Sequence, residues 1–190
     1  MIDPTTEIMH DTIGSIGEEE FRNNGKMYMA QYLGVGIDKV LFTENGESMI
    51  VNDVTDQRLK HDFEVEYGTD KIMVDIKTDS GTWQRTGNIV LEVYNPFKPS
   101  KAGWLLTTTA HAICFCLSDG KERPEHMRVI MASVAAMRRM VEDNNYKLVY
   151  LPKGSKAYCV PIDDILACKP GAQFWLKFNY VRGADKNERI

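Results

Sequence analysis

No apolar run in this 190-residue chain approaches the roughly 20 residues that a membrane-spanning helix requires. The N-terminal stretch, MIDPTTEIMHDTIGSIGEEE, has neither a basic start nor an apolar segment, so it does not read as a secretory signal. Basic residues are not in excess either, because 23 Lys and Arg stand against 27 Asp and Glu, a net charge of −4. This balance excludes a protein that coats nucleic acid by bulk charge, but it allows a local basic groove.

Cysteine pairs and nucleotide-binding glycine motifs are also missing. None of the four cysteines belongs to a C-x-x-C pair, and their spacing to histidines supports no zinc site; they are Cys114, Cys116, Cys159 and Cys168. We read them as buried, reduced thiols, and therefore expect a cytoplasmic protein without membrane contact. The absence of G-x-x-x-x-G-K-[ST], G-x-G-x-x-G and G-x-S-x-G motifs argues against P-loop, dinucleotide-binding and serine-hydrolase chemistry.

The hydrophobic fraction of 43% and the charged fraction of 26% are those of a globular domain. Alternating apolar residues and turn signals predict most of the strands, at 38–43, 47–54, 62–67, 71–77, 88–94, 112–118, 147–152 and 157–162. Helices are expected at 18–33, 105–112 and 124–143, the last because Pro124 suits a first helical turn and Ala and Met follow. We expect a polar lead-in at 1–17 and one α+β (α/β) domain at 18–190, with a central mixed sheet and flanking helices.

One pair of charged residues ends a strongly apolar strand. Side chains alternate along a strand, so Asp75 and Lys77 share one face while Val74 and Ile76 share the other. Asp62 opens the preceding strand of the same predicted hairpin, and an antiparallel pairing can bring it to the same point.

Two carboxylates and one ammonium at one point suit the hydrolysis of a phosphodiester bond. Carboxylate oxygens are ligands for Mg²⁺ or Mn²⁺, and the carbonyl of Ile76 could join Asp62 and Asp75 as a metal ligand. Such a metal polarises the phosphate and lowers the pKa of an attacking water, while Lys77 could orient that water or stabilise the developing charge. The alternative is a strand end held by a simple salt bridge, since chance gives about two acid-x-Lys triplets in such a chain.

Glu92 interrupts the apolar strand NIVLEVY. It is either an outward-facing side chain on a half-exposed strand or a third acid of the same site. The Met-rich segment that contains Met127, Met131, Met137 and Met140 is read as core rather than as a groove for a partner.

The arrangement resembles the PD-(D/E)XK, or restriction-endonuclease-like, nuclease superfamily, and is closest to uncharacterised phage-type members. The resemblance spans about residues 57–118, and its motifs are short. Its residues here are Gln57, Asp62, Asp75, Lys77, Thr86-Gly87-Asn88, Glu92, Gly103-Trp104 and Thr108-x-Ala110.

The resemblance implies an αβββαβ core and a metal-dependent nuclease that acts on DNA. Asp62 and Asp75 would be the metal-binding acids, Lys77 the catalytic lysine and Glu92 an auxiliary acid, with Gln57 nearby. An acid on the first helix, among Glu18, Glu19 and Glu20, could also contribute. The chain departs from the pattern at His61, where many members carry proline, and at His111, where related sequences carry an acid.

Further residues could contact the nucleic acid. Trp83 and Arg85 lie in the polar loop after the proposed site, where Trp83 could stack on a base or simply pack as a buried indole. Lys98 and Lys101 flank a proline-rich loop and could extend a basic rim. The resemblance also suggests that the protein forms a homodimer and, if a phage encodes the chain, that it is located in the host cytoplasm.

Two alternative functions remain. One is an inactive nuclease-fold phage protein that binds nucleic acid or a host protein, and the other is a structural protein with a buried ion-pair network.

Overall fold

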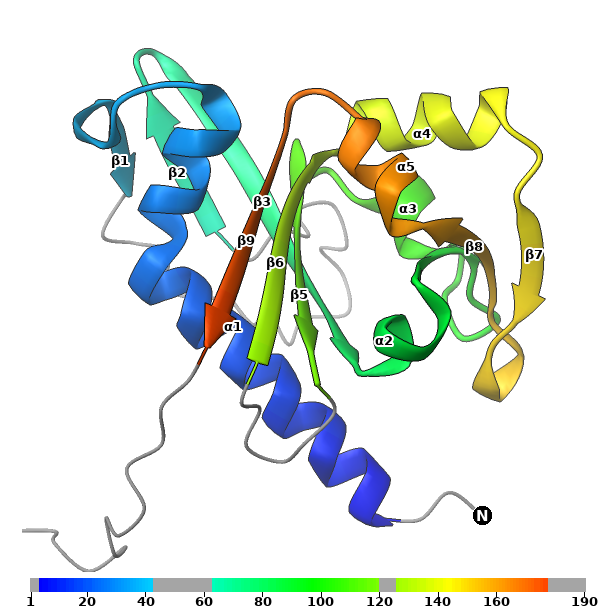
Figure 1. The fold of residues 1–190 in the computed structure, drawn as a ribbon. Coiled ribbons are helices and arrows are strands. Elements are labelled where there is room, and N and C mark those ends of the chain that lie inside the picture. Colours follow the sequence, from blue (N-terminus) through cyan, green and yellow to red (C-terminus); the bar gives the residue numbers. More distant parts are fainter. Residues whose placement is uncertain (1–3, 43–62, 120–125, 178–190) are drawn as a thin grey trace, which may run out of the picture.

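The computed structural model describes residues 4–42, 63–119 and 126–177, and its centre is a six-stranded mixed sheet (Figure 1). The strand order is β1-β2-β3-β5-β6-β9. Neighbouring strands are antiparallel except for β3 and β5, which are parallel. The strands are β1 (Val40–Phe42), β2 (Phe63–Tyr67), β3 (Asp70–Ser80), β5 (Ala112–Ser118), β6 (His126–Ser133) and β9 (Gly171–Lys177).

A second, three-stranded sheet and four short helices cover one face of the large sheet, and the long helix α1 covers the other (Figure 1). The small sheet has the order β4-β8-β7, with β4 (Asn88–Tyr94), β8 (Lys156–Pro161) and β7 (Lys147–Tyr150). The helices are α1 (Pro4–Leu33), α2 (Thr82–Thr86), α3 (Trp104–Thr107), α4 (Val134–Asp143) and α5 (Ile162–Ala167), with 3₁₀ turns at η1 (Ile37–Lys39) and η2 (Pro152–Gly154).

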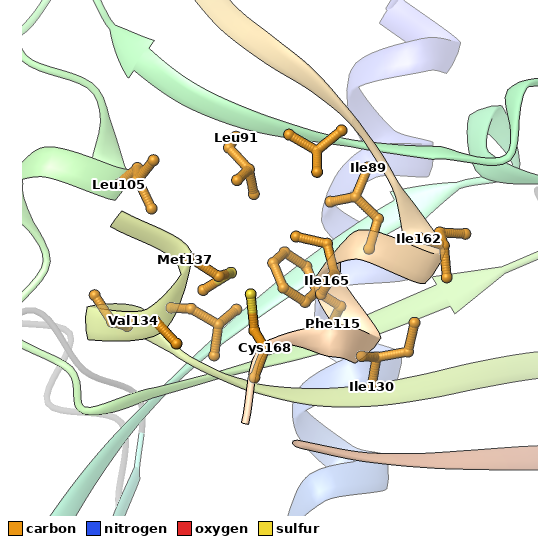
Figure 2. Close-up of a cluster of buried hydrophobic side chains, with 14 of the residues drawn as sticks. Ile89, Leu91, Leu105, Phe115, Ile130, Val134, Met137, Ile162, Ile165 and Cys168 are labelled. Atoms are coloured by element: carbon orange, nitrogen blue, oxygen red, sulfur yellow. The ribbon is translucent and has the colours of Figure 1, made fainter. Parts of the chain in front are cut away.

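The large sheet is buried on both faces, so there are two hydrophobic clusters. The α1 cluster joins Phe21, Tyr28 and Met29 of α1 to side chains such as Val74 and Met131 of the sheet. The second cluster lies between the two sheets (Figure 2) and contains, among others, Leu91, Leu105, Phe115, Ile130, Met137 and Ile165. Strands β5 and β6 each send alternate residues into the two clusters, as the period of a strand requires, whereas β3 contributes Val74 and Ile76 to the α1 cluster alone.

The expected α+β class, with a mixed sheet and flanking helices, is confirmed. The helix expected at 124–143 is wrong in its first half, because His126–Ser133 is the strand β6. The helix begins at Val134, where the Ser133 hydroxyl accepts a hydrogen bond from the Ala136 amide. Strand β6 lies between β5 and β9 with both faces covered, so its apolar residues form a continuous run that resembles a buried helix.

Other expectations are modified at their boundaries. Residues 4–17, expected as a polar lead-in, belong to α1, which continues to Leu33. The short helix expected at 105–112 is limited to Trp104–Thr107. The expected Glu44-Asn45-Gly46 turn and the strand at 47–54 lie outside the described residues. Met127, Met131 and Met137 are fully buried, which confirms their reading as core residues.

Candidate functional site

The candidate site is the pair formed by Asp75 and Lys77 on β3. The Lys77 Nζ lies 2.6 Å from Asp75 Oδ1 and donates a hydrogen bond to it. Asp75 is 6% exposed, although it is a carboxylate in the middle of a sheet. A second contact of Lys77 is with Trp104 of α3, whose ring centre lies 5.6 Å from Nζ. The pair therefore combines a buried carboxylate with a half-buried ammonium, and it lies next to Trp104, the first residue of α3.

The alternation of β3 explains why this pair faces the second layer. Val74 and Ile76 belong to the α1 cluster, so Asp75 and Lys77 point to the opposite face, where Lys77 meets Trp104 of α3. On the adjacent strand β5, the register partners of Asp75 and Lys77 are Ile113 and Phe115, both of which belong to the second cluster. A carboxylate in such apolar surroundings requires a partner, and Lys77 supplies one.

Two of the residues expected beside this pair, Asp62 and Gln57, lie outside the described residues. The described part of β2 begins at Phe63, which pairs with Val74 in the antiparallel ladder. Phe63 directly follows Asp62 in the sequence, and Val74 directly precedes Asp75. The side chain of Ile76, whose carbonyl was expected to bind metal, is 8% exposed and packs in the α1 cluster.

Glu92, read either as an outward-facing side chain or as a third acid facing Lys77, is on β4 and therefore in the other sheet. Ile89 and Leu91 of this strand are buried in the second cluster, whereas Glu92 is half-buried and accepts a 3.4 Å hydrogen bond from Asn95 Nδ2. Among the residues that the structure describes, no ion pair joins Glu92 to Lys77. The site that is visible thus consists of Asp75, Lys77 and the indole of Trp104.

Of the acids considered on the first helix, Glu20 lies on the far side of the sheet. It is 8% exposed, and it accepts hydrogen bonds from Asn24 Nδ2 at 2.6 Å and from the Tyr28 hydroxyl. Burial, together with the bond to Glu20, raises the pKa of Tyr28 well above its ordinary value. Because Tyr28 belongs to the α1 cluster, this group is separated from Asp75 by β3 itself.

The expected nucleic-acid contacts divide into exposed and buried residues. Arg85 and Lys101 are exposed, and Lys98 is half-buried. Trp83 is 9% exposed, and its Nε1 donates a 2.6 Å hydrogen bond to the carbonyl of Ser118. Of the two alternatives for Trp83, base stacking or packing in the core, the structure shows packing, and no ring face of Trp83 is free for a base.

Sequence reasoning missed the residue that fixes α3. Arg138 is half-buried and donates from Nε to the Leu105 carbonyl at 2.8 Å and from Nη2 to the Thr108 carbonyl at 2.9 Å. These bonds satisfy carbonyls at the end of α3, the helix that carries Trp104. A late-helix arginine gives no sequence signal for such a contact, because its acceptors are backbone atoms about 30 residues away.

His111 has a structural contact of its own at the start of β5. Its amide donates to the Met73 carbonyl at 2.8 Å, and its Nδ1 accepts a 3.0 Å hydrogen bond from the Met73 amide. His111 thus holds β5 against β3 next to Val74 and Asp75. The resemblance places an acid at this position; here the imidazole instead accepts a hydrogen bond from the backbone of β3.

Within residues 4–42, 63–119 and 126–177, no three side chains of His, Cys, Asp or Glu gather in a group that could hold a metal ion. The helices of that part of the chain include none with the length and apolar character needed to cross a membrane. In comparisons with known proteins, no protein-family model, curated protein or solved structure matches this chain.

Proposed function

We propose that this protein is a metal-dependent nuclease that hydrolyses phosphodiester bonds in DNA by means of metal-activated water. The observation that carries the proposal is the enclosed Asp75–Lys77 pair, with 2.6 Å between Oδ1 and Nζ, on a central strand. An acid and a lysine two residues apart on one strand face supply one metal ligand and one cation for this chemistry. The position of α1, the β2–β3 hairpin and the parallel strand β5 supports a nuclease-like core.

The type of ligand atom at this site, a carboxylate oxygen, is one that Mg²⁺ and Mn²⁺ prefer. A buried carboxylate oxygen is the ligand class that these cations prefer, and Asp75 provides it. A metal bound here would polarise the phosphate and lower the pKa of its water. In the proposal, Asp62 is the second acid, because it directly precedes the residue that pairs with Val74.

Lys77 has a defined part in this proposal. Its ammonium is held by Asp75 on one side and by the Trp104 ring on the other, so its position is fixed before a substrate arrives. A fixed ammonium beside the scissile phosphate orients the attacking water and stabilises the charge that develops on the phosphoryl oxygens. Exposed cations at Arg85 and Lys101 could contact the DNA backbone.

Calorimetric titration of Mn²⁺ tests the proposal on the wild type, Asp75→Asn and Asp79→Asn. Asp79 is a matched control because it lies on the same strand face, and its Oδ1 accepts hydrogen bonds from the amides of Thr82 and Trp83. An asparagine oxygen preserves these bonds. We expect saturable Mn²⁺ binding and DNA cleavage in the wild type and in Asp79→Asn, and neither in Asp75→Asn.

The second candidate is a nuclease-fold protein without activity that binds nucleic acid or a host protein. One observation favours it: Glu92, the third acid considered for the site, is held by Asn95 in the other sheet. A folded wild type that binds DNA but neither binds Mn²⁺ nor cleaves any DNA substrate would select this candidate. The homodimer that the resemblance implies is tested separately, by sedimentation equilibrium of the wild type.

A further inference from the structure

The edge strand β9 presents an indole to solvent. Trp175 is 63% exposed, although β9 is otherwise packed by Ala172 and Phe174 against the α1 cluster. Directly across the ladder is Arg128 of β6, whose guanidinium carbon lies 4.8 Å from the centre of the Trp175 ring. The guanidinium covers one face of the indole, and the exposed fraction shows that solvent reaches the rest.

Arg128 has hydrogen-bonding capacity left over. Its Nη2 donates a 2.6 Å hydrogen bond to Gln173 Oε1, and its Nε is buried without a partner in the described part of the chain. Burial lowers the pKa of Arg128, and the nearby carboxylate of Asp163 opposes that shift. The guanidinium is therefore held by the Trp175 stack and one amide; its buried Nε is closed to a ligand, and the remaining Nη hydrogens are the donors that face an acceptor on a ligand.

The Trp175 ring rests on a rigid support. Trp83 of α2 lies 6.2 Å from it between ring centres, at an interplanar angle of 55°. Trp83 is itself anchored by its hydrogen bond to the Ser118 carbonyl. We call Trp175, Arg128 and Gln173, with Trp83 behind them, the β9 platform. A preordered aromatic platform loses little conformational freedom when a ligand binds.

The β9 platform lies on the same face of the large sheet as the Asp75–Lys77 pair. The ladder registers align Asp79 of β3 with Leu117, Leu117 with Arg128, and Arg128 with Trp175. Asp79 shares its strand face with Asp75 and Lys77. Three ladder steps of about 4.8 Å place β9 about 14 Å from β3. Lys77 and Asp75 lie two and four residues from Asp79 along β3, about 7 and 13 Å at about 3.3 Å per residue, and a short stretch of a polynucleotide can span the combined distance.

We propose that the β9 platform binds a single-stranded nucleic acid by stacking a base on Trp175 while Arg128 contacts its phosphate or base oxygens. The inference rests on the proposed function, since it assigns the substrate of the Asp75–Lys77 site a single-stranded segment. The chemistry on the platform favours this occupant over an apolar protein surface. An indole stacks on any base, and a guanidinium with unused donors matches the acceptors of a polynucleotide. A purely apolar partner would bury those donors without acceptors.

Binding of a fluorescent oligo-dT of about ten nucleotides, within the site size of such platforms, tests the inference by anisotropy in EDTA. We expect Trp175→Ala to weaken binding by about tenfold or more, and Trp175→Phe to restore most of the affinity. Arg128→Gln should also weaken binding. The matched control is Tyr150→Ala in β7, because Tyr150 is 75% exposed and lies under a lysine, with Lys156 Nζ 5.3 Å from its ring centre. This variant should bind as the wild type does.

Two results would overturn the inference. The first is a wild type that does not bind the oligonucleotide. The second is a folded Trp175→Ala variant with unchanged affinity; if the wild type is also a dimer and this variant a monomer, the platform is instead an interface between two copies. Because binding is measured without metal, it is independent of cleavage. Cleavage without platform binding rejects only this inference, and platform binding without cleavage rejects only the nuclease.

Discussion

Asp75 and Lys77 meet at 2.6 Å between Oδ1 and Nζ, and their side chains are only 9% and 31% exposed. The two residues come from one strand, so no loop closure is needed to bring them together. Such a pair contributes little net stability when both partners are present, but the loss of one partner leaves an enclosed charge.

Lys77→Met should therefore destabilise the protein by about 1–3 kcal/mol, since the Asp75 carboxylate loses its cation. The double variant Asp75→Asn/Lys77→Met removes both charges and should recover most of that loss. Urea denaturation of the four proteins of this cycle measures the coupling. A double variant that is as unstable as the sum of the single variants would show that the pair is not coupled.

Arg138→Met should lower the free energy of unfolding by about 1–3 kcal/mol, because two carbonyls at the end of α3 lose a charged donor. The neighbouring Arg139 is exposed, so Arg139→Met is the control and should change stability by about 0.5 kcal/mol or less. If α3 positions Trp104 over Lys77, Arg138→Met should also reduce cleavage. Equal stability of the two variants would refute the role given to Arg138.

Gly103→Ala should destabilise the protein by about 1–3 kcal/mol through overpacking. A Cβ at Gly103 would lie 2.3 Å from the backbone carbonyl oxygen of Glu92, which cannot move without shifting β4. The φ of Gly103 is −73°, so the close approach and not the backbone angle requires glycine. Gly36, with φ −67°, is the control, because its new Cβ would meet only the side chain of Asp38. Thermal denaturation of Gly103→Ala and Gly36→Ala compares the two.

The alkaline limb of the stability profile should depend on Tyr146. Burial, followed by its 2.9 Å hydrogen bond to Asp164 and the charge of that carboxylate, raises the pKa of Tyr146 from 10.0 to about 12. Between these values the folded state keeps a proton that the unfolded state releases, so this contribution to stability falls as pH rises. Tyr146→Phe should show a shallower fall than the wild type in urea denaturation from pH 10 to 12. An unchanged slope would show that Tyr146 titrates normally in the fold.

Local patterns predicted that Asp75 and Lys77 share one strand face, but they predicted less of the fold around this pair. The alternation KIMVDIK was enough to place Asp75 and Lys77 on one face, because strand period is a local property. The alternation of NIVLEVY was equally clear, yet Glu92 lies in a different sheet. Which sheet a strand joins depends on partners far along the chain, here β8, and no local pattern contains that information.

The lack of tertiary information in a local pattern also explains why the strand β6 was predicted as a helix and why the exposed Trp175 was not predicted. In β6, Met127, Val129 and Met131 face one cluster while Ile130 and Ala132 face the other, so both helix and strand periods fit the apolar run. The indole with a free face is Trp175 and not Trp83, although the polar sequence around Trp83 predicts a loop; that segment forms α2. The distinction depends on Arg128 and Trp83 meeting Trp175 across the fold, which is a tertiary relationship.

The strands of the two sheets are interleaved along the sequence, so strands that pair in one sheet can be synthesised far apart in time. Strand β4 leaves the ribosome well before β8, the strand with which it forms its ladder, because β5, β6 and α4 are made in between. At translation rates of about 5–20 residues per second, that interval lasts seconds. During it the segment NIVLEVY has no ladder partner to cover its backbone, and Ile89 and Leu91 lack much of their eventual packing. The nascent chain therefore carries an apolar strand edge that a chaperone can bind, or that a second nascent chain can pair with.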